Sequence, residues 1–375
     1  AFDAQGRLRA SVNAGLSVWG LEAAPDGTAL VLADTVAWQL SGVPGPAGSP
    51  WLSPPAMVQV GERLALWDAG QGPSLEGIED SATVVFLGDV AVGRTMEAQL
   101  VRYGPGYPWQ GLAPLLQEAD LAIANLECVL TSHGSPLDKE YLIRAHPRWG
   151  QSLVAGGLDL VTIANNHALD FGHAGLDEMH STLSDQGIAA VGTDSSPGVM
   201  DAQLPGLFTL NGVRIAVLGY AATRWNGSVD VPATGRIAWA EVEAVQADVH
   251  AVRDQVDLVV VLLHAGTEYA AKPSKDQVAV ARTAIDAGAD LVVGHHPHVT
   301  QTVERYGNGL IVYSLGDALF DIPRPAAMQG DLLRIHATQD GLVQAELWPI
   351  WIEDAIRPRL LAGEQGAPRV EIIYP

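Results

Sequence analysis

Three histidines lie within four residues, at His295, His296 and His298, directly after the apolar run of DLVVGHHPH (290–298). Imidazoles crowded into one turn repel one another when protonated, and they leave ring nitrogens that need partners. Such a cluster is therefore usually held neutral by a metal ion or by acidic groups. The triplet predicts a metal site at the end of this run.

Other apolar runs also end in residues that bind metals. They end at Asp89, Asn125 with Glu127, Asn165-Asn166-His167, and His264. In open α/β sheets the carboxyl ends of the strands lie along one edge, where ligands bind. Carboxylates, amides and imidazoles from five strand ends would meet there. This donor set suits one or two divalent ions, with Mn, Fe or Zn as the expected metals.

Taken singly, these residues have simpler explanations. An Asp at a strand end, such as Asp89, is more often a turn residue or a helix N-cap. The doublet Asn165-Asn166 can build a turn, and His264 alone would more often be a core histidine. Because all of them fall at the same position relative to a strand, a shared site is the better explanation.

The elements that would position these residues begin near residue 83. Runs rich in Val, Ile and Leu alternate with helical patterns, and we predict strands at 83–89, 121–127, 159–166, 213–221, 257–264, 290–296 and 309–316. Such runs, separated by helices, are typical of sheets buried on both faces. The segment FTL-NG-VRIAVLGY predicts an antiparallel hairpin, and a second hairpin is expected after residue 330.

Residues 1–80 differ in composition from the rest of the chain. They hold four of the ten tryptophans, together with short apolar runs and Pro/Gly-rich connectors. We predict a small β-rich N-terminal domain or appendage with a Pro/Gly linker over 1–80, an α/β domain over 81–355, and a C-terminal tail over 356–375. Tryptophans of a β domain are more often core residues than carbohydrate-binding ones.

The charge limits the classes of partner. A formal net charge of −22 argues against nucleic-acid binding, because no basic surplus exists to neutralise phosphates. No apolar run reaches the roughly 18 residues that span a bilayer, so the chain as given is expected to be soluble. It begins at Ala1, which fits the removal of a targeting segment. The single cysteine, Cys128, excludes a disulfide framework within the chain.

Six ordered segments resemble the signature set of one protein family. They are GDVAVGR (88–94), NLE (125–127), ANNHALDFG (164–172), HAGTEY (264–269), GHHPHV (294–299) and YSLGD (313–317). Together they resemble the CapA family, the poly-γ-glutamate capsule synthesis proteins also called PgsA, over roughly residues 82–325. The resemblance implies a four-layer α/β/β/α metallophosphoesterase-like sandwich of the calcineurin-like superfamily, built around a two-metal site.

The resemblance also implies roles for individual residues. The implied metal ligands are Asp89, Glu127 as the bridging acid, Asn166, His264, His296 and His298. No clear role is implied for His295. Three positions depart from the pattern: Ala91 stands where the phosphoesterases carry a ligand histidine, Asp317 where the family usually has Asn, and Ala265 where it often has Trp. Asp317 would either supply the missing ligand or accept a hydrogen bond.

The remaining site residues belong to a hydrolytic mechanism. His167 would protonate the leaving group, with Asp170 fixing its tautomer. Arg94 would bind an anionic oxygen bidentately or form a surface ion pair. Glu268 would support His264 or act as a general base. Basic residues of DKEYLIRAHPR (138–148) are expected to form the substrate-side wall, namely Lys139, Arg144 and Arg148.

Two functions are consistent with these expectations. The first is a metal-dependent hydrolase that acts on a phosphoester, or on an amide linkage, in an extracellular or envelope-associated anionic polymer such as poly-γ-glutamate. The alternative is a non-catalytic component of capsule assembly that binds the polymer through a degenerate metal site. Capsule-synthesis membrane proteins are the expected partners of either. The negative charge of the chain weighs against tight polyanion binding.

Overall fold

The computed structural model describes residues 81–193, 204–222 and 236–361, and in addition seven short strands. The chain divides into two compact units, residues 80–370 and residues 1–79 with 371–375. The predicted Pro/Gly linker lies outside the described residues, as do residues 362–369 and 374–375 of the predicted tail. The predicted domain boundaries stay a prediction.

The described part of the smaller unit is a β-sheet. Its strands pair antiparallel in the order β1-β2-β3-β4. The strands are β1 (Val18–Ala23), β2 (Ala29–Ala33), β3 (Val36–Leu40) and β4 (Val58–Gln59). Near the end of the chain lies β23 (Val370–Ile373).

The first sheet of the larger unit has the order β10-β9-β6-β5-β20-β21-β22, with β19 also paired to β5. The pairings among β5, β6, β9 and β10 are parallel, as is that of β19 with β5, whereas β20, β21 and β22 pair antiparallel. The β20–β21 pair confirms the hairpin predicted after residue 330. The strands are β5 (Ala82–Val90), β6 (Leu121–Leu126), β9 (Leu160–Thr162), β10 (Ala189–Val191), β19 (Asp317–Leu319), β20 (Gln329–Thr338), β21 (Gly341–Glu353) and β22 (Arg357–Leu360).

The second sheet has the order β11-β12-β15-β16-β18-β17. The predicted hairpin between β11 and β12 is confirmed: Asn211 and Gly212 both have positive φ, at 49° and 84°, as a two-residue hairpin turn requires. The strands are β11 (Gly206–Leu210), β12 (Val213–Ala221), β15 (Leu258–His264), β16 (Leu291–His295), β17 (Val303–Tyr306) and β18 (Gly309–Val312).

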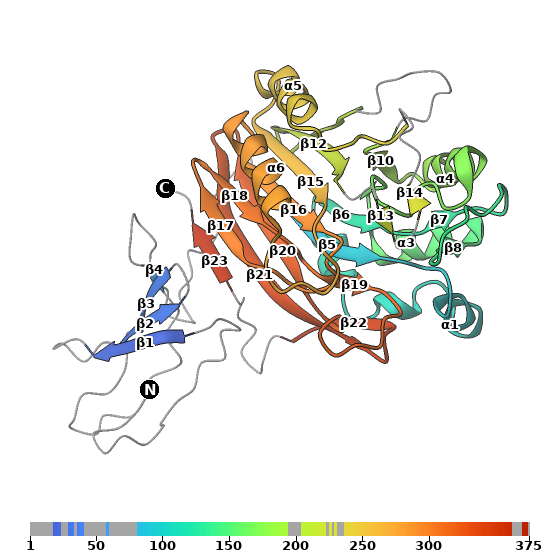
Figure 1. The fold of residues 1–375 in the computed structure, drawn as a ribbon, viewed down its shortest axis with the longest axis horizontal. Helices are drawn as coiled ribbons and strands as arrows, with labels where there is room; N and C mark the ends of the chain where they lie inside the picture. The colour runs from blue at the N-terminus through green and yellow to red at the C-terminus, as the bar shows by residue number, and fades with distance from the viewer. Residues whose placement is uncertain are drawn as a thin grey trace, which may run out of the picture. The chain divides into compact units, whose positions relative to one another are not determined.

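Helices cover the outer face of each sheet (Figure 1). On the first sheet, Leu87 of β5 shares a buried cluster with Leu100 and Leu116 of the helices α1 and α2. Residues of α3 and α4 belong to the same cluster. These helices are α1 (Met96–Tyr103), α2 (Ala113–Glu118), α3 (Gly150–Gly156) and α4 (Gly172–Asp185), and the second sheet is covered by α5 (Val242–Arg253) and α6 (Lys275–Asp286).

The inner faces of the two sheets pack on each other. Along β12, Leu218 joins the cluster formed with α5 and α6, whereas the alternate residue Val217 is fully buried and lies outside that cluster. A Cβ added at Gly219, on the same face as Val217, would meet Thr162 of β9 in the first sheet. The predicted four-layer α/β/β/α sandwich is therefore confirmed.

The remaining elements are short. They are β7 (Val129–Leu130), β8 (Arg144–Ala145), β13 (Trp225–Asn226) and β14 (Val229–Asp230), with the 3-10 turns η1 (Tyr107–Trp109) and η2 (Pro147–Trp149). Among the described residues, no helix combines the length and apolar character needed to cross a bilayer.

Two glycines allow the backbone to pack tightly next to the predicted ligands. A Cβ at Gly88, which precedes Asp89, would lie 1.9 Å from the carbonyl oxygen of Gly316. A Cβ at Gly294 would lie 1.9 Å from the carbonyl oxygen of Tyr313. Any side chain at either position would push apart the strand ends that carry the polar residues.

Candidate metal centre

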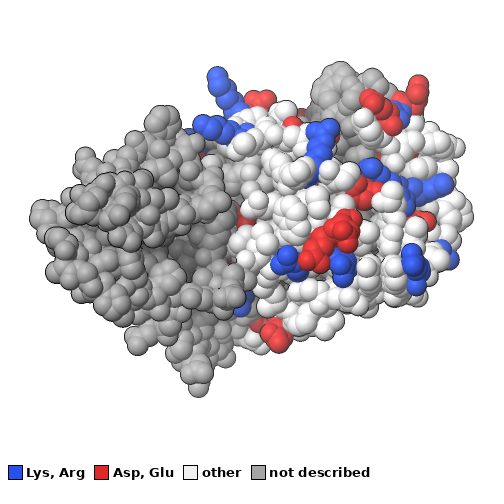
Figure 2. Space-filling model, turned by 90° about the horizontal axis from the view of Figure 1, so that it is seen from below, with Lys and Arg blue, Asp and Glu red and all other residues white. Residues whose placement is uncertain are grey.

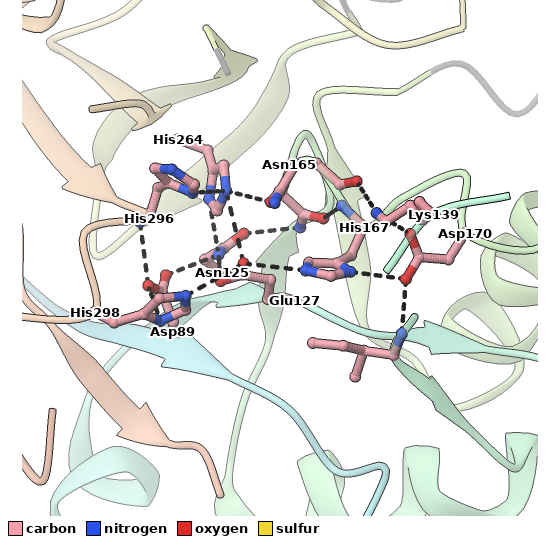
Figure 3. A network of polar contacts seen from close by, with 12 residues as sticks. Asp89, Asn125, Glu127, Lys139, Asn165, His167, Asp170, His264, His296 and His298 are labelled. Carbon is pink, nitrogen blue, oxygen red and sulfur yellow. Dashed lines mark hydrogen bonds and ion pairs between the residues drawn. The ribbon is translucent and has the colours of Figure 1, made fainter. Parts of the chain in front are cut away.

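The six predicted metal ligands come together between the two sheets, and all are buried; Figure 3 labels all of them except Asn166. The ligand atoms of five of them, all but Asn166, form two groups, each with atoms within 4.8 Å of one another. One group contains Glu127, His264 and His296, and the other contains Asp89, Glu127 and His298. Glu127 belongs to both, so it stands where a bridging ligand would stand.

The strongest indication of a metal is one oxygen of Glu127. Its Oε1 has no hydrogen-bond partner among the described residues. The Nε2 atoms of His264 and His298 each lie 3.8 Å from it, and Nε2 of His167 lies 3.9 Å away. These distances are too long for hydrogen bonds. Two ligand atoms that each lie about 2.1 Å from one ion can be up to about 4.2 Å apart, so the spacing fits shared metal coordination.

The pKa of Glu127 also indicates a metal ion at this position. Burial, and next the Asp89 carboxylate, raise the pKa of Glu127 well above its ordinary value. A buried carboxylate without a partner costs several kcal/mol unless a cation compensates it. A divalent ion beside Glu127 would supply that compensation. The residues therefore fit the metal that the donor set predicts.

The histidines of the first group are held in their metal-binding form. Burial, and next the neighbouring imidazoles, lower the pKa of His264 well below its usual range, and burial lowers that of His296 to about 3. Neutral imidazole is the form that binds metals. Nε2 of His264 lies 2.8 Å from Oδ1 of Asn166 and 3.1 Å from Nδ1 of His296. Asn166 thus adds an amide oxygen to this group.

The backbone that carries the last two ligands is strained. His296 has φ of 93° and His298 has φ of 55°, in the left-handed region that residues other than Gly rarely adopt. The amide of His296 donates to Oδ2 of Asp89 over 3.1 Å, which ties this turn to β5. Strain of this kind costs about 1–3 kcal/mol per residue and is typical of functional sites.

His295 and two asparagines support the ligands. Nδ1 of His295 lies 3.3 Å from Oδ1 of Asp89, and His295 belongs to neither ligand group. Burial opposes ionisation of Asp89, but the nearby imidazoles of His295 and His298 lower its pKa. The amide of Asn125 donates to the same carboxylate over 2.8 Å. Asn165 donates to the Leu126 carbonyl and accepts from the His167 amide, so it builds the turn.

The contacts of Asp317 match one of the two roles left open for it, that of a hydrogen-bond acceptor. Its Oδ1 lies 2.8 Å from Nδ1 of His298, in the position of a hydrogen-bond acceptor, and it belongs to neither ligand group. Nε2 of His298 then faces Glu127. Ala91 is buried and supplies no ligand atom. A carboxylate that fixes the ring of a ligand histidine in this way sets its tautomer and raises its basicity.

We expect Asp317→Ala to weaken metal binding at the group that contains His298 by about 10–100-fold, because the ring loses the acceptor that orients it. Competition with a chromogenic chelator would measure this loss. The group that contains His264 and His296 should keep its affinity, since Asp317 contacts neither residue. Unchanged affinity for both ions would contradict the role assigned to Asp317.

His167 is held from behind by a buried ion pair (Figure 3). Its Nδ1 lies 2.7 Å from Oδ2 of Asp170, as the predicted tautomer-fixing role requires. Asp170 is fully buried, accepts the backbone N–H of Ile143 over 2.7 Å and contacts the ammonium of Lys139. That ammonium also donates to the carbonyl of Asn166 over 2.8 Å. Lys139 thus lies inside the site, behind His167.

We expect Lys139→Met to destabilise the protein by about 3–5 kcal/mol, because the Asp170 carboxylate would lose the cation that compensates its burial. Chemical denaturation would measure the free energy of unfolding. The double variant Lys139→Met/Asp170→Asn should recover much of the loss, since no buried charge then lacks a partner. An equal loss of unfolding free energy in the single and the double variant would show that packing, and not charge, is responsible.

A pocket with a volume of about 240 Å³ reaches the ligand His298. Of the predicted residues, Arg94, His167, Glu268 and His298 line it. Nε of Arg94 lies 3.3 Å from Oδ1 of Asp321, so the predicted ion pair of Arg94 exists at the pocket edge.

The other predicted basic residues lie elsewhere. Arg144 stacks over Phe171 with its guanidinium carbon 4.8 Å from the ring centre, and Arg148 stacks over Trp149 at 4.4 Å. Neither residue lines the pocket. The pocket wall is formed in part by residues that the sequence did not single out: Tyr141, Tyr269, Asp321 and Arg324. Tyr269 is the last residue of HAGTEY, and Tyr141 lies within DKEYLIRAHPR (138–148), whereas Asp321 and Arg324 lie in neither segment.

Comparison with known proteins agrees with this geometry. Residues 83–322 match the family described as bacterial capsule synthesis protein PGA_cap. The chain is 30% identical over 280 residues to the PGA biosynthesis protein CapA of Bacillus subtilis, covering 74% of this chain and 73% of that protein. It is 28% identical over 283 residues to the capsule biosynthesis protein CapA of Bacillus anthracis, covering 73% and 68%.

The solved structures to which this chain is similar include nucleotidases. A 5'-nucleotidase precursor from Thermus thermophilus has a TM-score of 0.46 and 14% identity, and the match covers 77% of this chain and 56% of that one. The NAD nucleotidase NadN of Haemophilus influenzae has a TM-score of 0.44 and 13% identity, with coverage of 76% and 54%. This chain thus matches a little over half the length of each.

Proposed function

Because the chain belongs to the bacterial capsule synthesis protein PGA_cap family, we propose that it is a metal-dependent hydrolase acting on an anionic polymer of the cell envelope. The observation that carries this proposal is the arrangement of His167. It lines the pocket, lies near the shared Glu127 and is held from behind by Asp170 and Lys139. A site that only bound polymer would have no need of a proton-transfer group held in this way.

The donor set suits Mn, Fe or Zn, as one ion or two. When bound, such ions lower the pKa of a coordinated water and polarise a phosphoryl or carbonyl oxygen. The ligands would be Asp89, Glu127, Asn166, His264, His296 and His298. Their burial between the sheets keeps bulk water from competing for the charged groups.

The other residues handle protons and the substrate. His167 donates a proton to the leaving group, and the acceptor Asp170 keeps the ring oriented for that step. Lys139 keeps Asp170 in place, and we assign it this positioning role instead of substrate contact. Glu268 lies exposed at the pocket, where it can accept a proton from the attacking water. Arg94 binds an anionic oxygen of the substrate.

The names of the relatives guide the choice of substrate. The two CapA proteins are named for capsule and PGA biosynthesis. We propose that the substrate is poly-γ-glutamate or a precursor of it, cleaved at a γ-glutamyl amide or at a phosphoester. The chain would then act at the cell envelope, in association with capsule-synthesis membrane proteins.

One observation favours the alternative function, polymer binding without turnover. Ala91 stands where the phosphoesterases possess a ligand histidine, and Asp317, whose Oδ1 contacts His298, belongs to neither ligand group. The ligand group around Asp89 therefore has fewer donors than a complete two-metal site. Turnover measurements separate the two functions.

The test is hydrolysis by protein loaded with Mn, Fe or Zn. Phosphate monoesters, phosphate diesters and γ-glutamyl oligomers would be offered, and phosphate, alcohol or free glutamate release would be measured, with chelator-treated protein as the control. Metal-dependent turnover of any of these substrates supports the proposal. Absence of turnover with all three metals, together with saturable polymer binding, would favour the alternative.

A further inference from the structure

We propose that Arg94 and Arg324 form a two-arginine clamp that binds one anionic group of the substrate, a carboxylate or a phosphate, beside the metal centre. The inference rests on the proposed function, because it gives the substrate class of the same site. Both residues line the pocket, and they approach it from loops that follow β5 and β19. Arg324 plays no part in the mechanism described above.

Among the described residues of the larger unit, most other arginines pair with a carboxylate, and Arg324 does not. Arg214, Arg253 and Arg282 each pair with a carboxylate within 2.7 Å. In the described part of the chain, no acidic side chain forms an ion pair with Arg324. Its guanidinium instead stacks over Tyr269, with the central carbon 4.2 Å from the ring centre. Stacking uses the face of a guanidinium and leaves its edge donors available for an oxyanion.

The position of Arg324 is tied to the metal centre through Tyr269. The amide of Tyr269 donates to the carbonyl oxygen of Pro297 over 2.8 Å, and Pro297 lies between the ligands His296 and His298. The ring centre of Tyr269 lies 5.9 Å from that of His298. Tyr269 itself has a positive φ of 59°, which a residue other than Gly adopts only when its surroundings enforce it. An anion held by Arg324 would therefore lie at a set distance from the ligands.

Arg94 is held in place from the other side. Asp321 accepts from the backbone N–H of Thr95 over 3.1 Å and from its hydroxyl over 2.6 Å, and it lies 3.3 Å from Nε of Arg94. This contact uses Nε, so the two terminal nitrogens have no acceptor among the described residues. The Arg94 side chain is 41% exposed, so a ligand in the pocket can reach them.

The charge distribution makes a local clamp necessary. Among the described residues on the face shown in Figure 2, basic and acidic side chains are interspersed, and no broad basic area appears there. The whole chain carries −22. Long-range attraction therefore cannot gather a polyanion, and close hydrogen bonds must do so.

The size of the pocket limits what the clamp can hold. Its volume of about 240 Å³ is below the range of about 300–1,000 Å³ that is typical of pockets for drug-sized ligands. One repeat unit of a polymer fits better than several. Glu268 also lies at the pocket and would repel a second anionic unit placed next to it. The clamp would thus recognise a single charged unit, and short oligomers should bind about as tightly as long chains.

Isothermal titration calorimetry tests the clamp directly, without requiring turnover. A γ-glutamyl trimer and inorganic phosphate would be titrated into metal-free and metal-loaded protein, as wild type and as Arg94→Ala, Arg324→Ala and Arg324→Lys. Arg102→Ala is the matched control, because Arg102 also stacks on a tyrosine, at 4.9 Å from Tyr103, and lies outside the pocket.

We expect each alanine variant to bind at least about 10-fold more weakly than wild type, since a charge-assisted hydrogen bond contributes about 1.5–3 kcal/mol. The affinity of Arg324→Lys should lie between that of wild type and that of Arg324→Ala, because lysine keeps the charge but lacks the planar fork. An amidated trimer, which lacks the charges, should bind weakly to all variants alike.

The outcomes are distinguishable from a failure of the proposed hydrolysis. Loss of affinity in the trimer arm identifies a carboxylate as the bound group, and loss in the phosphate arm identifies a phosphate. Either loss supports the clamp even if no variant shows turnover. Wild-type protein that binds neither ligand, or alanine variants that bind both as tightly as Arg102→Ala, would overturn it.

Discussion

Glu127→Ala is expected to lose both metal ions, whereas His296→Ala and His298→Ala should each lose one. The reason is geometric: Glu127 belongs to both ligand groups, and each of the two histidines belongs to a single group. The unpartnered Oε1 of Glu127, with three imidazole nitrogens around it, is the point that the two groups share. No other residue in the two groups should show this double effect.

Elemental analysis of protein purified without chelator measures the stoichiometry. His250→Ala, an exposed histidine on α5, serves as the control for nonspecific loss. Two ions in wild type and none in Glu127→Ala would support a bridged pair. One ion in wild type would indicate that the absence of a ligand at Ala91 has reduced the site to one metal, and none would refute the metal centre.

His167→Ala should lower kcat by about 10²–10⁴-fold on substrates with poor leaving groups, because the leaving atom would depart without a proton. Substrates with good leaving groups, such as nitrophenyl esters, should lose far less. Asp170→Asn should show the same pattern, since Asp170 holds Nδ1 of His167 at 2.7 Å. Steady-state kinetics on a matched pair of phosphate esters would measure both effects.

The metal content of these variants is the necessary control. His167 is not in either ligand group, so His167→Ala should bind as much metal as wild type. An equal loss of kcat on good and poor leaving groups, with metal retained, would contradict the proton-donor role. Loss of metal would mean instead that His167 is itself a ligand.

Much of the fold and of the ligand set was predictable from the sequence, because both depend on patterns along the chain. The apolar runs that end at Asp89, Glu127, His264 and His295 became β5, β6, β15 and β16 in parallel arrangements. Parallel pairing brings the carboxyl ends of strands to one edge regardless of sequence details. Within each sheet the predicted ligands therefore had to line up once the strands formed, and the packing of the two sheets then brought the two sets together. Their roles in catalysis stay predictions.

Only the tertiary structure decided which neighbour each supporting side chain contacts. Asp317 turned out to orient His298, and Lys139 turned out to lie behind His167 instead of on an open wall. Arg144 and Arg148 lie away from the pocket, and Arg324 lines it. Such contacts join loops that are far apart in the chain, as with Tyr269 and Arg324. No local pattern encodes them, because they depend on how both sheets and their loops pack together.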